Sequence, residues 1–127
     1  MRKVAAVLVA VAFVLDTAAP AQADIVRICH ARARGVDPSA TAACRVNYPR
    51  RIWVTIKARP KQYAWGNYSM VCSKGTGDDR RHGHYSGTTP FSLALTMPYR
   101  RPDTCWVVAT GILNQPGTVI VILTARV

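Results

Sequence analysis

The sequence predicts an all-β fold, a small antiparallel β-sandwich. Several segments alternate apolar with polar residues or are rich in β-branched residues, and turn signals separate them at close spacing. Helical periodicity is scarce. A central pair of cysteines, Cys72 and Cys105, falls on segments with strand character, as expected where a disulfide crosslinks the core of a sandwich.

Residues 1–23 predict a secretory signal peptide. Two basic residues precede an apolar run at positions 4–15, and Ala21-Gln22-Ala23 supplies the small-x-small cleavage pattern. A membrane-spanning helix needs about 20 residues, so a retained anchor is the weaker alternative. We therefore expect a secreted, soluble protein in which residues 24–127 form a single domain.

The first part of this domain has mixed signals. Residues 25–29 have the composition of a strand. Asp37-Pro38 is typical of a helix cap followed by proline at the first helical position. This pattern predicts a short helical turn that continues through an Ala-rich segment to Arg45.

The middle of the chain predicts two strands and a loop. Apolar and polar side chains alternate over residues 51–59. A second strand is expected over residues 63–73, with Cys72 facing inward. Residues 74–87 are Gly-rich and polar, which predicts a long exposed loop with, as an alternative, a short strand at 84–86.

The last third predicts three strands. Apolar positions alternate over residues 91–97, and a turn follows at 99–103. Residues 105–113 and 118–126 are apolar and β-branched, and the turn signal Asn114-Gln115-Pro116-Gly117 between them predicts a hairpin. Both strands are apolar on both faces, so we expect them to be central and covered.

The stretch from Phe91 through Asp103-Thr104-Cys105-Trp106 to the closing strands resembles the last three strands of an immunoglobulin-like domain. The resemblance implies an immunoglobulin-like sandwich. Such sandwiches host many binding and structural roles, so it implies no particular function.

Four cysteines in a short exported chain predict two disulfides and no free thiol. Three connectivities are possible. We favour Cys29 with Cys44 and Cys72 with Cys105 because these pairs close the shorter loops. The chain has no Cys-x-x-Cys pair, which leaves a zinc site or a thioredoxin-like centre without support.

Positive charge is the most visible chemical feature. Residues 24–127 carry 12 Arg and 3 Lys against 5 Asp, a net charge of +10, and the chain has no Glu. Guanidinium groups bind phosphate and carboxylate in bidentate fashion. The candidate contacts for an anionic extracellular or cell-envelope partner are the paired arginines Arg50, Arg51, Arg80, Arg81, Arg100 and Arg101. The alternative is that these arginines reflect overall composition and cover a solvated face.

Residues 78–84 hold the other polar cluster of interest. Imidazole and carboxylate groups can bind a transition metal, and this segment contains Asp78, Asp79, His82 and His84. The surrounding glycines, however, leave such a loop without a preorganised site. Without Glu, a paired-carboxylate mechanism would need Asp78 and Asp79, which are poorly placed to flank a bond. No nucleophile-elbow pattern surrounds a serine. We therefore predict no metal site, no cofactor and no enzymatic activity.

Aromatic residues lie among the basic ones, as a single-strand nucleic-acid surface requires. They are Trp53, Tyr63, Trp65 and Tyr68. In a strand-rich chain such aromatics pack in the core or across strands, so nucleic acid is not the favoured partner.

The segment Cys29 to Cys44 is C-H-A-R-A-R-G-V-D-P-S-A-T-A-A-C and is similar to the first disulfide loop of the bacterial subtilisin-inhibitor-like family. The shared positions are the cysteine interval, Gly35, Pro38, Ala40, Ala43 and Cys44. That family places its protease-facing residue two positions after its third cysteine, here Lys74 in Cys72-Ser73-Lys74-Gly75. The resemblance implies an alternative function, inhibition of a trypsin-like serine protease. The segment Gly75-Thr76-Gly77 departs from the Tyr-Asp-Pro that the family has there.

Overall fold

The computed structural model describes residues 25–127, which form eight strands and no helix. The predicted signal peptide and the predicted mature N-terminus at Asp24 lie outside the described residues. The strands are β1 (Ile25–Gly35), β2 (Ser39–Asn47), β3 (Arg51–Arg59), β4 (Tyr63–Lys74), β5 (Gly77–Thr88), β6 (Phe91–Ala94), β7 (Thr104–Leu113) and β8 (Gly117–Arg126). No helix in this part of the chain is long and apolar enough to cross a membrane.

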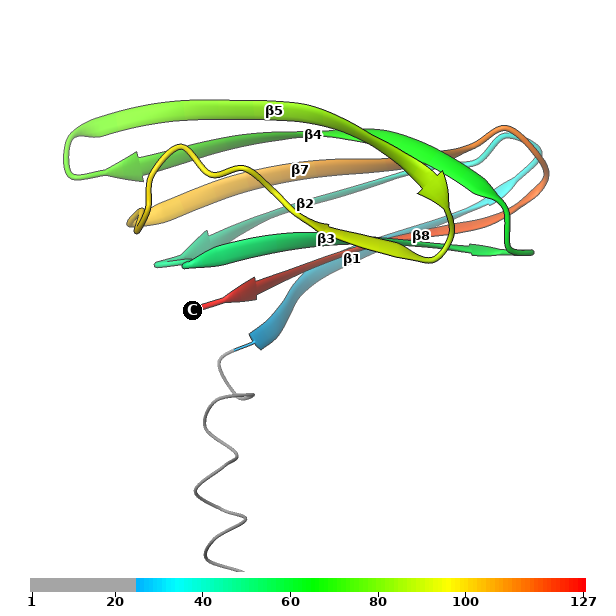
Figure 1. Ribbon diagram of the computed structural model, residues 1–127, viewed down its shortest axis with the longest axis horizontal. Helices are drawn as coiled ribbons and strands as arrows, with labels where there is room; N and C mark the ends of the chain where they lie inside the picture. Colours follow the sequence, from blue (N-terminus) through cyan, green and yellow to red (C-terminus); the bar gives the residue numbers. More distant parts are fainter. Residues whose placement is uncertain (1–24) are drawn as a thin grey trace, which may run out of the picture.

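The strands form two four-stranded sheets, confirming the predicted antiparallel sandwich. One sheet has the order β1-β8-β3-β6 and the other has the order β2-β7-β4-β5, with antiparallel pairing throughout. Figure 1 shows the two layers lying one over the other along the length of the molecule. Consecutive strands mostly alternate between the sheets, and this order is that of a jelly roll. The immunoglobulin-like connectivity suggested by the last strands is therefore wrong, although the sandwich architecture is right.

The core lies between the sheets and is built from alternate residues of each strand. In β3 the inward residues Ile52, Val54 and Ile56 are fully buried. They face a second layer from the other sheet, which includes Met70 of β4 and Val107 of β7. The strand-period alternation predicted for residues 51–59 and 63–73 is confirmed, because period-2 patterns place all apolar side chains on one face.

Both predicted disulfides are present, and no cysteine is free. Cys29–Cys44 joins β1 to β2 and therefore joins the two sheets. Cys72 and Cys105 lie directly opposite each other on β4 and β7 of one sheet. This second disulfide therefore crosslinks neighbouring strands of one sheet. In immunoglobulin domains, by contrast, the conserved disulfide bridges the two sheets.

The helical turn predicted from Asp37 to Arg45 is wrong. Ser39–Asn47 forms β2, which pairs with β7 along its whole length. Its inward positions hold small side chains, among them Ala40 and Ala42, so the alternation that marks a strand is hidden by its Ala-rich composition. Pairing with β7 overrides the local helix signal.

The predicted C-terminal hairpin is also wrong, although its two strands are where the sequence places them. β7 lies between β2 and β4, whereas β8 lies between β1 and β3 in the other sheet. The turn between them therefore crosses from one layer to the other. Each strand is central in its own sheet, which explains the apolar composition.

The long exposed loop predicted over residues 74–87 is mostly strand β5. A two-residue turn at Gly75 and Thr76 places Lys74 opposite Gly77, and β5 pairs with β4 from there to Thr88. Aromatic rings from its neighbours cover the glycines on its inward side: a Cβ at Gly83 would lie 2.8 Å from the Tyr68 ring. β5 contributes few apolar residues of its own, so its sequence lacks the pattern of a strand.

Similarly, the strand predicted over residues 91–97 is shorter than expected. β6 covers Phe91–Ala94. The following residues cross to the other sheet as an irregular segment, in which Leu95 is buried. This segment, residues 95–103, builds one side of the site described next.

Candidate anion-binding site

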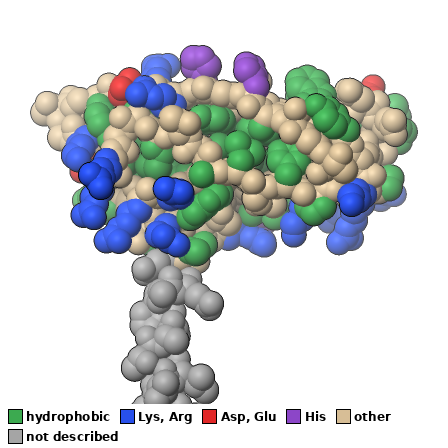
Figure 2. All heavy atoms as spheres, viewed as in Figure 1, with side chains coloured by type: hydrophobic (Ala, Val, Ile, Leu, Met, Phe, Trp, Pro, Cys, Tyr) green, Lys and Arg blue, Asp and Glu red, His purple; other side chains and the backbone are tan. Residues whose placement is uncertain are grey.

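Five arginines meet at one end of the sandwich. Arg50 and Arg51 lie at the start of β3, Arg126 ends β8, and Arg100 and Arg101 belong to the β6–β7 segment. Arg51 and Arg126 are directly paired across β3 and β8. We call these five residues the arginine end. Figure 2 shows Lys and Arg side chains gathered at the end of the molecule where β8 terminates in Figure 1.

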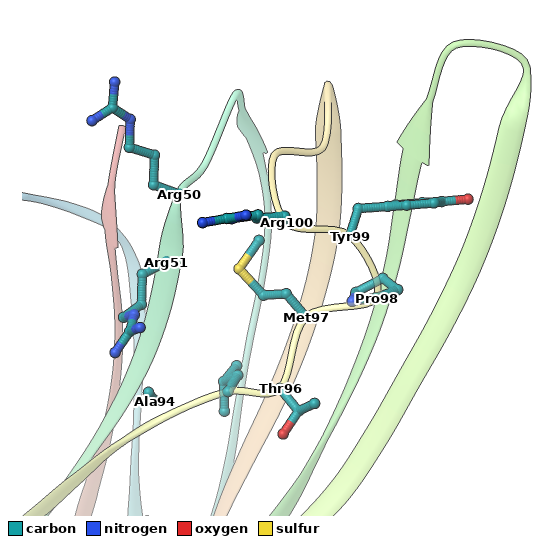
Figure 3. A pocket seen from close by; sticks show the side chains of 9 residues that line it. Arg50, Arg51, Ala94, Thr96, Met97, Pro98, Tyr99 and Arg100 are labelled. Carbon is teal, nitrogen blue, oxygen red and sulfur yellow. The ribbon is translucent and has the colours of Figure 1, made fainter.

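Two adjoining hollows open at the arginine end. The first has a volume of about 440 Å³ and is lined by Arg50, Arg51, Ala94, Leu95, Thr96, Met97, Pro98, Tyr99 and Arg100. The second has a volume of about 600 Å³ and is lined by Arg50, Arg51, Trp53, Arg100, Arg101 and Arg126. In Figure 3, Arg100 and Met97 point from the β6–β7 segment towards β3, and Tyr99 points away. The first hollow is therefore lined by arginines together with the apolar residues Ala94, Leu95, Met97 and Pro98.

The charge of the arginine end is not neutralised by the protein. Among residues 25–127, the one ion pair joins Arg81 to Asp79, on β5. All five arginines of the site are exposed to solvent. The guanidinium of Arg126 lies 5.9 Å from the centre of the Trp53 ring, a cation–π contact that steadies the side chain without removing its charge. An anion at this end would relieve the repulsion among the like charges.

Backbone contacts hold the segment that carries Arg100 and Arg101. Leu95 N donates to the carbonyl of Ile52 at 2.8 Å, and Thr96 N donates to the Tyr68 hydroxyl at 3.2 Å. At the far side, Asp103 N donates to the carbonyl of Ser73 at 2.8 Å. The segment is thus fixed to both sheets, although it is irregular.

Hydrogen bonds also hold Arg50 and the side chain of Asp103 in place. Arg50 N donates to the carbonyl of Arg126 at 2.6 Å, which ties the start of β3 to the end of β8. The Asp103 carboxylate accepts a hydrogen bond from Gly75 N at 2.7 Å, so this acidic side chain is engaged by the β4–β5 turn. The arginines therefore project from a framework that needs little rearrangement to bind.

The structure brings together four of the six arginines predicted as anion contacts. Arg80 and Arg81 lie apart from them on β5, where Asp79 engages Arg81. Sequence reasoning missed Arg126, and it considered Trp53 only as part of a possible nucleic-acid surface. Arg126 stands alone in the sequence, and its proximity to Arg51 depends on the pairing of β3 with β8.

The other predicted site residues are separated from the arginine end. His82 and His84 face outwards on β5, opposite Ser69 and Asn67 of β4. No group of three or more His, Cys, Asp or Glu side chains within residues 25–127 could hold a metal ion. The predicted absence of a metal site and of catalysis remains a prediction.

Lys74, the protease-facing residue of the alternative function, lies at the tip of the β4–β5 hairpin. Ser73 before it is paired with Asp78 on one side and with Thr104 on the other. A segment that binds a protease as an added strand needs free backbone groups. The hairpin therefore does not present Ser73 and Lys74 in that form.

No protein-family model and no curated protein matches the chain. Solved structures with a distant likeness include "Crystal structure of PirA", with 10% identity, a TM-score of 0.42, and coverage of 76% of this chain and 90% of that one. A structure of TmCBM61 in complex with β-1,4-galactotriose has 11% identity, a TM-score of 0.45, and coverage of 81% and 69%. The Glycosylation Associate Protein (Gap123) complex from Streptococcus agalactiae has 8% identity, a TM-score of 0.37, and coverage of 78% and 26%.

Proposed function

We propose that this protein is a non-catalytic binding protein that engages an anionic polymer outside the cell through the arginine end. The observation that supports the proposal is the convergence of five unpaired guanidinium groups from three separate segments on two adjoining hollows. Two disulfides in a small β domain are typical of extracellular proteins. The partner we infer is a phosphate- or carboxylate-bearing polymer of the cell envelope.

The chemistry of the site favours oxyanions over other ligands. Guanidinium groups present planar, fixed donors that match the oxygens of phosphate and carboxylate. The hollows are open and shared by the same arginines, Arg50, Arg51 and Arg100. A polymer with repeated charges can occupy several of these arginines at once, whereas a single small anion would leave most of the charge unpaired.

Binding to two sugar-free polyanions tests the proposal: long-chain polyphosphate and polyglutamate. If all five arginines contact charges, the logarithm of the affinity for polyphosphate should fall with the logarithm of salt concentration with a slope of about −3.5. The ratio of the two affinities tells whether phosphate or carboxylate is preferred. Affinity for both polymers that is unchanged at high salt would contradict the proposal.

Paired variants separate the site from net charge. Arg100→Gln/Arg101→Gln should reduce the polyphosphate slope to about −2 and weaken binding more than tenfold at low salt. The control Arg32→Gln/Arg34→Gln removes the same charge from exposed positions on β1, outside both hollows. We expect the control to have a much smaller effect. Equal effects of the two variants would show that polyphosphate binding depends only on the net charge of the protein and not on the arginine end.

A further inference from the structure

The outer face of the β2-β7-β4-β5 sheet carries two exposed tryptophans, distinct from the arginine end. Trp65 of β4 is 40% exposed and Trp106 of β7 is 47% exposed. Tryptophan is seldom left this accessible on the flat face of a sheet. Each tryptophan therefore leaves a large part of its surface open to solvent.

The two rings stand far apart along the sheet. Trp106 lies opposite Val71 of β4, six residues along the strand from Trp65. At the rise of a β-strand this is a separation of about 20 Å. A single small molecule would not span that distance, but an extended polymer would.

Hydrogen-bonding side chains occupy the face between the tryptophans. They are Thr41, Asn67, Ser69, His82, His84 and Thr110, accompanied by the small or apolar Ala43 and Val108. The rows between the two tryptophans contain no Lys, Arg, Asp or Glu, whereas Arg45 of β2 lies directly opposite Trp106 and Arg80 of β5 lies opposite Val71 in the same row. Figure 2 shows histidine side chains standing clear of the surface above β5.

Local contacts fix the polar groups and one of the rings. Trp65 Nε1 donates to Asn114 Oδ1 at 3.3 Å, which sets the orientation of the indole. The Thr110 hydroxyl lies 3.2 Å from Asn67 Oδ1, and Asn67 N donates to Thr110 Oγ1 at 3.0 Å. The amide nitrogen of Asn67 has no partner within the described residues and remains available to a ligand.

We propose that this face binds an uncharged polysaccharide, with Trp65 and Trp106 as stacking platforms. Pyranose rings have an apolar face of C–H groups, which packs on an aromatic ring, and an equatorial belt of hydroxyls, which needs donors and acceptors. The two indole rings can each pack against one sugar ring of an extended glycan, and the polar side chains between them can hydrogen-bond to the hydroxyls of the sugars in between. The uncharged stretch between the platforms favours a neutral glycan over a polyanion, because Arg45 and Arg80 add charge only beside Trp106.

The distribution of apolar groups argues against a protein partner or a second copy of the chain. Protein interfaces concentrate aromatic and apolar residues at their centre and polar residues at the rim. Here the order is reversed, because the large rings lie at the two ends and Asn67, Ser69 and Thr110 lie between them.

Isothermal titration with soluble xylan, galactan, mannan and dextran tests the proposal. We expect one or more of these polymers to bind with an affinity that persists at molar salt, because neutral ligands make no screened contacts. Trp65→Ala and Trp106→Ala should each weaken binding about tenfold, and Trp65→Phe should retain most of it. Unfolding curves must stay two-state in each variant, so that loss of fold is not mistaken for loss of contact.

Three results would overturn the proposal. These are failure of all four glycans to bind, binding that the tryptophan replacements leave unchanged, and a dimer that Trp65→Ala or Trp106→Ala dissociates. Arg100→Gln/Arg101→Gln should lower polyphosphate binding and leave glycan binding intact. Either proposal can therefore fail without the other.

Discussion

Replacing Tyr85 with Phe tests how the β2-β7-β4-β5 sheet holds its binding face. The Tyr85 side chain is buried, and its hydroxyl lies 2.6 Å from the carbonyl oxygen of Thr110 and 3.0 Å from that of Asn67. The ring passes under Gly66, where a Cβ would stand 2.8 Å from Tyr85 Cε1. One hydroxyl therefore serves two carbonyls on neighbouring strands β4 and β7.

The cost of Tyr85→Phe follows from the partners that remain. The Asn67 carbonyl keeps a hydrogen bond from the Thr110 hydroxyl at 3.3 Å, whereas the Thr110 carbonyl loses its shortest contact. An acceptor left unsatisfied by a buried apolar group costs about 1–3 kcal/mol. We expect Tyr85→Phe to lower the free energy of unfolding by about 1.5 kcal/mol. For a domain of this size that loss lowers Tm by roughly 6–12 °C.

Urea denaturation of the oxidised protein measures the loss. The slope m should be unchanged, because the variant alters stability without altering the surface exposed on unfolding. Tyr63→Phe is the matched control, since the Tyr63 side chain is 56% exposed on the same sheet and its hydroxyl is free to bond water. A loss below about 0.5 kcal/mol for Tyr85→Phe, or equal losses in the two variants, would refute the reasoning.

Four further outcomes are expected. Burial raises the pKa of Tyr85 above its ordinary value of 10.0, so above pH 10 the unfolded chain releases this proton and the folded chain keeps it. Stability should then fall with rising pH more steeply in the wild type than in Tyr85→Phe, as pH-dependent urea midpoints would show. Gly66→Ala should cost at least about 3 kcal/mol, because the new Cβ would overlap the Thr110 carbonyl; an unchanged urea midpoint would contradict this. Joint replacement of Cys29 and Cys44 by Ala should lower the free energy of unfolding, measured by calorimetry, by about 3 kcal/mol. Replacing Cys72 and Cys105 should cost more, because that disulfide closes a longer loop, and a smaller loss there would contradict this reasoning. Because Lys74 lies in a paired hairpin, a molar excess of the protein should leave trypsin fully active; dose-dependent inhibition abolished by Lys74→Asp would restore the inhibitor hypothesis.

The sequence predicts the fold class because period-2 alternation depends on neighbouring residues alone. Strands β3 and β4 carry that alternation in large side chains and were placed correctly. β2 was missed, and β5 was expected only as an alternative short strand at 84–86, because the evidence for these two strands is not local. Inward alanines hide the alternation in β2, and β5 has glycines where rings from other strands pack, such as Tyr68 against Gly83.

Connectivity escaped prediction for a related reason. The apolar segments that form β7 and β8 are joined by a turn signal, which locally has the chemistry of a hairpin. Whether the turn pairs the strands or carries the chain to the other sheet depends on partners far away. β8 pairs with β1 and β3, whose pairing partners cannot be read from their own sequences.

The arginine end illustrates what topology adds to a charge pattern. The pairs at 50–51 and 100–101 were identified from sequence, yet their convergence with Arg126 requires the antiparallel pairing of β3 with β8 and a crossing segment from β6 to β7. Arg80 and Arg81 form an equivalent pair in sequence, but they lie on β5, an edge strand of the sheet that contains neither β3 nor β8. Pair spacing along the chain therefore cannot distinguish the arginines that converge from those that do not.

Both proposed surfaces depend on the start of β7. The residues before it carry Arg100 and Arg101, and the third residue of the strand is Trp106. Two hydrogen bonds and a disulfide fix this start. Asp103 N donates to the carbonyl of Ser73, the Asp103 carboxylate accepts from Gly75 N, and Cys105 is joined to Cys72 of β4. None of these groups belongs to a proposed ligand-binding set. The two surfaces can therefore bind chemically different polymers, or different parts of one polymer, while the bonds at the start of β7 keep the two surfaces in a constant relative position.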